Sequence, residues 1–224
     1  MRRWLIVAGL AVATLVAGGA VAALVLAPTG DGTAEQLASG QQALESQQHN
    51  QPHSQQPSQP QVTPEQVPGT GVTAIGDSVM LAAATALKQR FPGMYVDAKE
   101  SRQMSTAPGL IQTMLQQGDL GSVVLLGLGT NGPFDGSILT QIEQELGPSR
   151  ILLLVNVHEP KPWQDQVNAT LAAAVHPPRV CLVDWNAAIT PHPELLWHDN
   201  IHARPSGAQL YTSLIASALP PQYR

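Results

Sequence analysis

The chain of 224 residues contains a single cysteine, and only 12% of its residues are charged. With Cys181 alone, neither an intrachain disulfide nor a zinc site made of cysteines can form. Cys181 lies in an apolar run, residues 180–183, which favours the ordinary role of a small buried side chain. No block of like charges occurs and the formal net charge is −5, so the sequence gives no sign of a nucleic-acid-binding surface.

Charged residues are also absent from a long segment near the N-terminus. Arg2 and Arg3 precede the uncharged residues 4–27, a stretch of 24 residues, and a bilayer core needs about 20. The apolar region of a cleavable signal peptide is only about 7–15 residues long, so the length favours an uncleaved membrane anchor over residues 1–27. Cleavage after Ala27, which would give a secreted protein, is the alternative. The paired arginines predict a cytoplasmic N-terminus and place the rest of the chain outside the membrane.

Aromatic residues are missing from residues 28–70, which contain eleven glutamines and several prolines. Such a segment has too little apolar surface to offset the conformational entropy that ordering would cost. We therefore expect residues 28–70 to be a disordered linker rich in glutamine and proline, which spaces the following domain from the membrane.

Residues 71–224 have the length of one domain and alternate short apolar runs with amphipathic segments. Strands are predicted at residues 72–75, 95–98, 122–128, 150–157 and 180–185. Helices are predicted at residues 79–90, 107–117, 137–146, 164–175 and 206–219. Continuously apolar strands, such as residues 123–126, are typical of a parallel sheet covered on both faces. The pattern predicts an α/β fold, a three-layer α/β/α sandwich with a five-stranded parallel sheet, whose ligands bind at the carboxyl ends of the strands.

The first predicted strand ends at Gly76-Asp77-Ser78, and a helix is expected to follow at once. Gly76 permits a sharp turn, so Ser78 would lie at the helix N-terminus with an exposed hydroxyl. Its backbone N–H would be free to bind an oxyanion. A helix cap formed by Asp77 or Ser78 is an equally good explanation of these residues alone.

Two further sets of polar residues follow predicted strands. Asn131, after the third strand, offers an amide donor, although an Asn-Gly pair is also a common turn. Asp199 and His202, after the fifth strand, are three residues apart, so a carboxylate can orient an imidazole that activates a serine. An ordinary surface loop, or a metal site formed with His192 and His198, would explain the same residues. All three sets of polar residues follow the carboxyl ends of predicted strands, which is where this fold binds its ligands. The sequence therefore favours a serine nucleophile.

These motifs resemble those of the SGNH (GDSL-type) hydrolase family. Residues 76–78 resemble its first block, residues 129–131 its third, and Asp199 with His202 its last. Residues 101–104, 161–163 and 183–185 resemble more narrowly the extracytoplasmic SGNH domains of acyltransferase-3 proteins, which include peptidoglycan O-acetyltransferases. The resemblance covers residues 71–219 and implies a flavodoxin-like SGNH hydrolase domain over residues 71–224.

The resemblance also implies a role for each matching residue. Ser78 would be the nucleophile, His202 the general base, and Asp199 the group that orients the base. The backbone N–H of Ser78 and the side chain of Asn131 would form an oxyanion hole. Relatives carry a glycine in the second block, where this chain has Ser101, whose backbone N–H can still complete the hole.

Two expectations concern the substrates. Residues 158–163 follow the fourth predicted strand, so Trp163 would stack on a sugar ring with Lys161 at its edge; a purely structural aromatic is the alternative. Relatives in this group carry a multi-span acyltransferase domain, whereas this chain has one apolar segment. We therefore expect either a separate membrane acyltransferase as the acyl donor or outright ester hydrolysis.

The predicted reaction is serine-dependent cleavage or transfer of small acyl groups, acetyl above all, on cell-envelope carbohydrate, without a metal or other cofactor. His202 would take the Ser78 proton, an acyl-serine would form, and water or a sugar hydroxyl would release it. The sequence does not separate the hydrolase from the transferase. Two other classes are a carbohydrate-binding module without catalysis and a metal-dependent hydrolase that uses the histidines.

Overall fold

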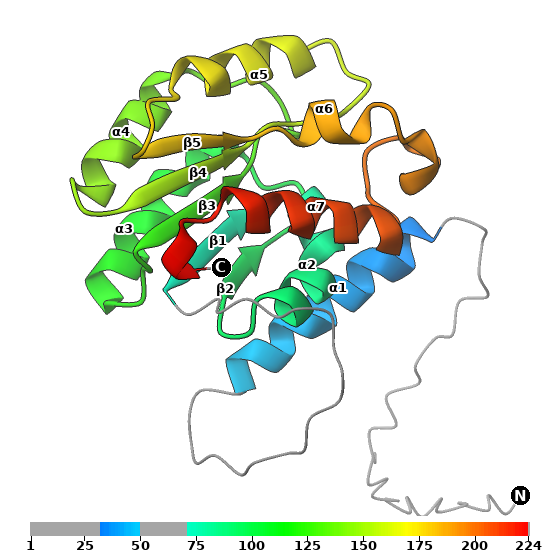
Figure 1. Ribbon diagram of the computed structural model, residues 1–224, viewed down its shortest axis with the longest axis horizontal. Coiled ribbons are helices and arrows are strands. Elements are labelled where there is room, and N and C mark those ends of the chain that lie inside the picture. Colours follow the sequence, from blue (N-terminus) through cyan, green and yellow to red (C-terminus); the bar gives the residue numbers. More distant parts are fainter. Residues whose placement is uncertain (1–31, 50–70, 224) are drawn as a thin grey trace, which may run out of the picture.

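The computed structural model describes residues 32–49 and 71–223, and its centre is a parallel five-stranded sheet (Figure 1). The strands lie in the order β2-β1-β3-β4-β5. Their bounds are β1 (Val72–Gly76), β2 (Tyr95–Ala98), β3 (Val123–Gly127), β4 (Ile151–Val155) and β5 (Val180–Val183). Every residue of β1 is buried, as are four of the five in β3 and in β4, because helices cover both faces of the sheet.

The helices form a layer on each side of this sheet (Figure 1). One layer consists of α1 (Thr33–His49), α2 (Ser78–Arg90), α6 (Trp185–Ile189) and α7 (Pro205–Ala218). The other consists of α3 (Ala107–Gln117), α4 (Ser137–Leu146) and α5 (Gln164–Ala173). Short 3-10 helices occur at η1 (Met104–Thr106), η2 (Pro193–Leu195) and η3 (Pro221–Tyr223). Each layer shares one hydrophobic core with its face of the sheet, so the predicted α/β/α sandwich is confirmed.

The fifth strand is shorter than the sequence predicts. It ends at Val183, and Asp184 then caps α6 by accepting a hydrogen bond from the Ala187 N–H at 3.0 Å. Asn156 Nδ2 donates to the same Asp184 oxygen at 2.7 Å. The predicted strand continues to residue 185 because Trp185 is apolar. In the structure Trp185 is instead the first residue of α6, and it is 1% exposed.

The expectation of a disordered linker over residues 28–70 is wrong for Thr33–His49, which form α1. Its contact face repeats at helical spacing, with Leu37, Gly40 and Leu44 turned toward the domain. A Cβ at Gly40 would collide with the main-chain carbonyl of Leu81, so the glycine lets α1 approach α2 closely. The composition of this segment hid the helix because the glycine contributes nothing to a hydrophobic pattern.

A glutamine side chain holds α1 to the edge of the sheet, although glutamine-rich composition is typical of disordered segments. The Gln47 amide pairs with the backbone of edge strand β2: Nε2 donates to the Val96 carbonyl at 3.2 Å, and Oε1 accepts from the Val96 N–H at 3.1 Å. Lys88 Nζ also donates to Gln47 Oε1, at 2.7 Å. The side chain thus satisfies strand groups that have no neighbouring strand.

Two other expectations about the N-terminal part of the chain, the membrane anchor and the rest of the linker, concern residues that the structure does not describe. The predicted anchor, residues 1–27, and residues 50–70 of the predicted linker lie outside the described residues. Within residues 32–49 and 71–223, no helix combines the length and the apolar character that crossing a bilayer requires.

Candidate active site

The turn between β1 and α2 presents Ser78. Asp77 is the N-cap of α2, and its Oδ1 accepts a hydrogen bond from the Val79 N–H at 3.0 Å. A Cβ at Gly76 would collide with the Met80 side chain, so the glycine allows the strand to pack against the helix that follows it. Ser78 is half-buried and is the first residue of α2, where backbone N–H groups have no acceptor within the helix. The helix cap and the half-buried serine at the helix N-terminus, which are alternatives in the sequence, therefore coexist on the neighbouring residues Asp77 and Ser78.

Asp199 and His202 form a pair in the loop before α7. Asp199 Oδ2 lies 2.6 Å from His202 Nδ1, while Asp199 Oδ1 accepts from the backbone N–H groups of Ile201 and His202 at 2.9 and 3.0 Å. Burial opposes the charge of Asp199, but these hydrogen bonds outweigh it and hold the pKa of the carboxyl below its usual value. A charged Asp199 fixes the proton of His202 on Nδ1 and leaves Nε2 as the basic nitrogen.

His202 Nε2 is buried and has no hydrogen-bond partner among the described residues. A buried nitrogen without a partner is unusual in a folded protein and needs a physical reason. Burial raises the pKa of Asp77 to about 6, and the charge of His202 opposes this shift, which places His202 near the Asp77 carboxyl. Ser78 follows Asp77 directly, so the basic nitrogen and the serine belong to the same end of the sheet.

The two loops expected to complete the oxyanion hole are joined by hydrogen bonds. Asn131 Nδ2 donates to the carbonyl of Arg102 at 3.2 Å, and Gln103 Nε2 donates to the carbonyl of Asn131 at 3.0 Å. Because an amide has two N–H donors, Asn131 keeps one for a ligand. Ser101 is exposed and has φ 57°, a left-handed conformation that suits glycine. This backbone fits the glycine that the family resemblance implies at the position of Ser101.

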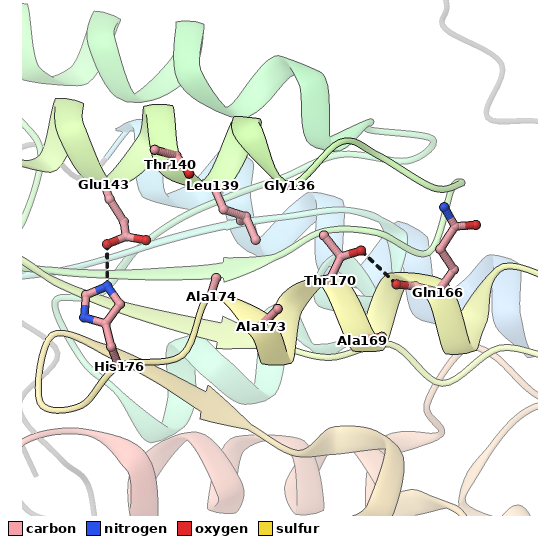
Figure 2. A pocket seen from close by; sticks show the side chains of 10 residues that line it. All are labelled: Gly136, Leu139, Thr140, Glu143, Gln166, Ala169, Thr170, Ala173, Ala174 and His176. Atoms are coloured by element: carbon pink, nitrogen blue, oxygen red, sulfur yellow. Dashed lines mark hydrogen bonds and ion pairs between the residues drawn. The ribbon is translucent and has the colours of Figure 1, made fainter.

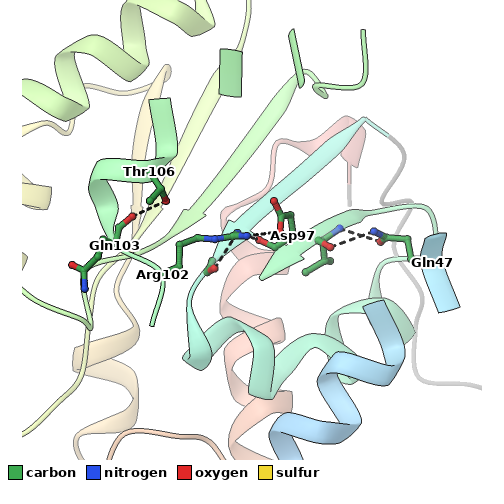
Figure 3. A network of polar contacts seen from close by, with 7 residues as sticks. Gln47, Asp97, Arg102, Gln103 and Thr106 are labelled. Atoms are coloured by element: carbon green, nitrogen blue, oxygen red, sulfur yellow. Dashed lines mark hydrogen bonds and ion pairs between the residues drawn. The ribbon is translucent and has the colours of Figure 1, made fainter. Parts of the chain in front are cut away.

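Arg102 connects the strand ends under the site, a role that the sequence did not reveal (Figure 3). Its Nη2 lies 2.6 Å from Asp97 Oδ1, and Nη1 donates to the main-chain carbonyls of Asp97 at 2.5 Å and Gly76 at 3.3 Å. Through its own carbonyl it also holds Asn131. Arg102 thereby links β1, β2 and the loop after β3, three segments that are far apart in the sequence.

Two buried carboxyls lie beside the nucleophile. Glu159 is 2% exposed, and its Oε1 has no hydrogen-bond partner in the described part of the chain. The pKa of Glu159 is raised to about 7, mainly by burial and also by the charge of Asp77, while Trp163 and Lys161 oppose the shift. Burial also raises the pKa of Asp77 to about 6, against hydrogen bonds from Val79 and Thr130. The burial of these two carboxyls is not visible in the local sequence pattern.

The two predicted substrate-binding residues differ in their surroundings. Trp163 is half-buried against the core, and its Nε1 donates to the carbonyl of Thr130 at 3.3 Å. Lys161 is exposed, with its backbone N–H bonded to the Glu159 carbonyl at 2.9 Å. Trp163 therefore packs against the core next to the loop that carries Asn131, and its role toward a sugar ring stays a prediction.

Other polar groups of the molecule lie away from these residues. A groove between α4 and α5 has Glu143 Oε2 and His176 Nε2 2.6 Å apart at one end, and none of the predicted site residues lines it (Figure 2). In the described ranges, no three His, Cys, Asp or Glu side chains are grouped so that they could hold a metal ion. Cys181 is half-buried in β5 and packs against the core.

Comparison with known proteins gives relatives of one kind. No family model matches the chain. YrhL of Bacillus subtilis is 38% identical over 149 residues, which are 66% of this chain and 23% of that protein. Peptidoglycan O-acetyltransferase OatA of Listeria monocytogenes is 33% identical over 150 residues, 67% of this chain and 24% of that protein. The chain therefore spans about a quarter of the length of the curated relatives it matches.

Solved structures agree with the sequence comparison. The C-terminal catalytic domain of Streptococcus pneumoniae peptidoglycan O-acetyltransferase A superposes with a TM-score of 0.61 at 29% identity, over 69% of this chain and 94% of that domain. Its structure carries a methylsulfonyl adduct. Since fold and sequence agree, the chain belongs to the SGNH (GDSL-type) hydrolase family and is homologous to the catalytic domains of peptidoglycan O-acetyltransferases.

Proposed function

We propose that the chain is a serine-dependent acyl enzyme that moves small acyl groups, acetyl above all, on cell-wall carbohydrate. The observation that carries this proposal is His202, which Asp199 orients at 2.6 Å while its buried Nε2 has no partner. A basic nitrogen kept free at the end of the sheet that carries Ser78 is the arrangement that an acyl-serine mechanism needs. The named activity of the relatives, peptidoglycan O-acetylation, supports the substrate class.

In the proposed reaction, Ser78 Oγ attacks the acyl carbonyl and its proton passes to His202 Nε2. The backbone N–H groups of Ser78 and Ser101 and the second amide hydrogen of Asn131 stabilise the oxyanion. As the tetrahedral intermediate collapses, His202 returns the proton to the leaving oxygen and an acyl-serine remains. A sugar hydroxyl or water then attacks, with His202 again taking the proton, and Ser78 is regenerated.

Residues near the site support a sugar as the acyl acceptor, and the N-terminal residues support a location outside the membrane. Trp163, fixed by Thr130 beside the Asn131 loop, offers an aromatic surface for a sugar ring, with the exposed Lys161 at its edge. Residues 4–27 anchor the chain in the membrane, and Arg2 and Arg3 orient it so that the domain lies outside. A separate membrane acyltransferase supplies the acyl group.

The test is an acetyl-transfer assay with the full-length chain in detergent. The protein is incubated with 4-nitrophenyl acetate and peptidoglycan oligosaccharides, and mass spectrometry measures acetylated sugar and free acetate. We expect Ser78→Ala to abolish both products, and Ser122→Ala, an exposed serine before β3, to change neither. Acetate without acetylated sugar would identify an esterase, and equal activity of Ser78→Ala would contradict the serine mechanism.

A further inference from the structure

Helix α1 brings the start of the described chain to the catalytic end of the domain. A Cβ at Gly32, the residue before α1, would collide with the indole ring of Trp197. In Figure 1 the beginning of α1 correspondingly lies beside the beginning of α7. Gly32 therefore sits against the loop that precedes α7.

Trp197 belongs to the same tight loop as the proposed catalytic pair. Its backbone N–H donates to the carbonyl of His202 at 2.9 Å, and its carbonyl accepts from the Asn200 N–H at 2.9 Å. Arg204 stacks on the ring, 4.3 Å from its centre. A segment that leaves the domain at Gly32 thus leaves it next to Asp199 and His202.

Because α1 packs on the domain, only residues 28–31 connect residue 27 to the described structure. Four residues, 28–31, separate Ala27 from Gly32, and five extended residue steps span at most about 18 Å. A fully extended linker over residues 28–70 would instead reach up to about 150 Å. With α1 packed on α2, the length of chain between residue 27 and the contact of Gly32 with Trp197 is therefore limited to about 18 Å.

We propose that α1 docks the domain with its active-site edge facing the lipid bilayer, so that Ser78 opens toward the membrane surface. The inference rests on the membrane anchoring in the proposed function. Two contacts hold this orientation: the close approach of Gly40 to Leu81, and the pairing of Gln47 with Val96. The loop that contacts Gly32 carries Trp197, which stacks with Arg204, and tryptophan is enriched at both membrane–water interfaces. An acyl donor held in the membrane would then reach the serine without crossing open solvent.

The orientation can be measured with the full-length chain in liposomes that contain nitroxide-headgroup lipid. After Cys181→Ala removes the natural cysteine, one fluorescent NBD label is placed at Glu194→Cys, on η2 near the active site, or at Gln117→Cys, at the opposite edge. A five-residue strand of about 17 Å separates the two edges, so we expect at least about twofold stronger quenching at 194 than at 117. Equal quenching at the two positions in vesicle-bound protein would overturn the inference.

A pair of variants on α1 tests the cause. Gly40→Val forces a side chain against the Leu81 carbonyl and should release α1, so the difference between the two labels should disappear. Ala38→Val, on the exposed face of the same helix, should retain it. A difference that survives Gly40→Val would show that α1 does not set the orientation.

Two controls separate this inference from the proposed function. Vesicle flotation reports anchoring: protein that does not float contradicts the anchor and the inference together. Hydrolysis of 4-nitrophenyl acetate reports the serine chemistry, which is expected to survive Gly40→Val because the substrate is soluble. Floating, active protein with equal quenching at both positions would overturn the orientation alone.

Discussion

Nη2 of Arg102 lies 2.6 Å from Oδ1 of Asp97, in a salt bridge whose arginine side chain is only 9% exposed. The same guanidinium bonds the Gly76 carbonyl, two residues before Ser78. Lysine at this position would keep the charge and lose the planar fork that makes several bonds at once. We expect Arg102→Lys to lower kcat by about tenfold to a hundredfold with little change in KM, because misplaced catalytic groups cost rate more than binding.

Arg150→Lys is the matched control, since Arg150 also bonds main-chain carbonyls, those of Gly121 and Leu146, but at the other end of the sheet. Arg150→Lys should change the free energy of unfolding without changing kcat. Steady-state kinetics with 4-nitrophenyl acetate and urea unfolding would measure both quantities. An unchanged kcat in Arg102→Lys would show that Arg102 does not position the serine turn.

The tautomer of His202 is expected to depend on Asp199. Asparagine would keep the shape of the side chain but could turn its N–H₂ group toward Nδ1, which would move the imidazole proton to the catalytic nitrogen. In a serine protease the corresponding change lowers kcat by about 10⁴-fold, so we expect Asp199→Asn to lower kcat by about 10³–10⁴-fold. Asp135→Asn changes an exposed carboxylate that accepts a hydrogen bond from the Ser137 N–H at the start of α4, and it should have normal activity. A loss below tenfold would argue that the carboxylate does not orient the base.

The left-handed backbone at Ser101 predicts a stabilising substitution. An L-residue in this region costs about 1–2 kcal/mol, and glycine avoids most of that cost while adding freedom to the unfolded chain. We expect Ser101→Gly to raise the free energy of unfolding by about 0.5–1 kcal/mol and to keep kcat, because the backbone N–H remains. Ser101→Val should lower both, since a β-branched residue fits this conformation poorly. Urea unfolding in which Ser101→Gly is less stable than wild type would contradict the prediction.

Glu159 should make the protein less stable as the pH rises. Its pKa is about 7 in the folded protein and ordinarily 4.5, so between these values the folded state binds more protons than the unfolded state. Stability therefore falls as the pH rises from about 4.5 to 7 and stays lower above that range. Asp77, with a pKa of about 6 against 3.8, acts in the same direction over a lower interval.

Replacing Glu159 by glutamine isolates its share of this effect. Glutamine has nearly the size of protonated glutamate and cannot ionise, so the fall in Tm between pH 5 and pH 8 should be smaller in Glu159→Gln than in wild type. Glu100→Gln removes an exposed carboxyl and should leave the fall unchanged. Parallel Tm curves for wild type and Glu159→Gln would rule out a buried ionisation at this position.

Local patterns explain how much of the fold could be predicted. The five strands and α2, α3, α4, α5 and α7 end within two residues of their predicted bounds, because their apolar spacing and flanking glycines are local signals. Helix α1 was missed because its contact face depends on Gly40 and on glutamine side chains. These residues contact Leu81 and Val96, which lie far along the chain, so a local sequence pattern does not reveal the contacts.

The same distinction applies to the site. Ser78, Asn131, Asp199 and His202 could be proposed because each follows a predicted strand, where parallel sheets bring residues together. Arg102 bonds Gly76 and Asp97. Glu159 interacts with Asp77 and Trp163. No spacing in the sequence reveals these contacts. Burial gave Glu159 its raised pKa, and burial of a single polar residue is visible only in the fold.

The central claim is that Ser78 is a nucleophile activated by His202, and covalent labelling tests it most directly. The full-length chain is treated with a fluorophosphonate, digested, and the modified peptide identified by mass spectrometry. We predict a single adduct on Ser78, none in Ser78→Ala, and strongly slowed labelling in His202→Ala, because the serine is a poor nucleophile without its base. Labelling of Ser78→Ala to the same extent as wild type would contradict the account.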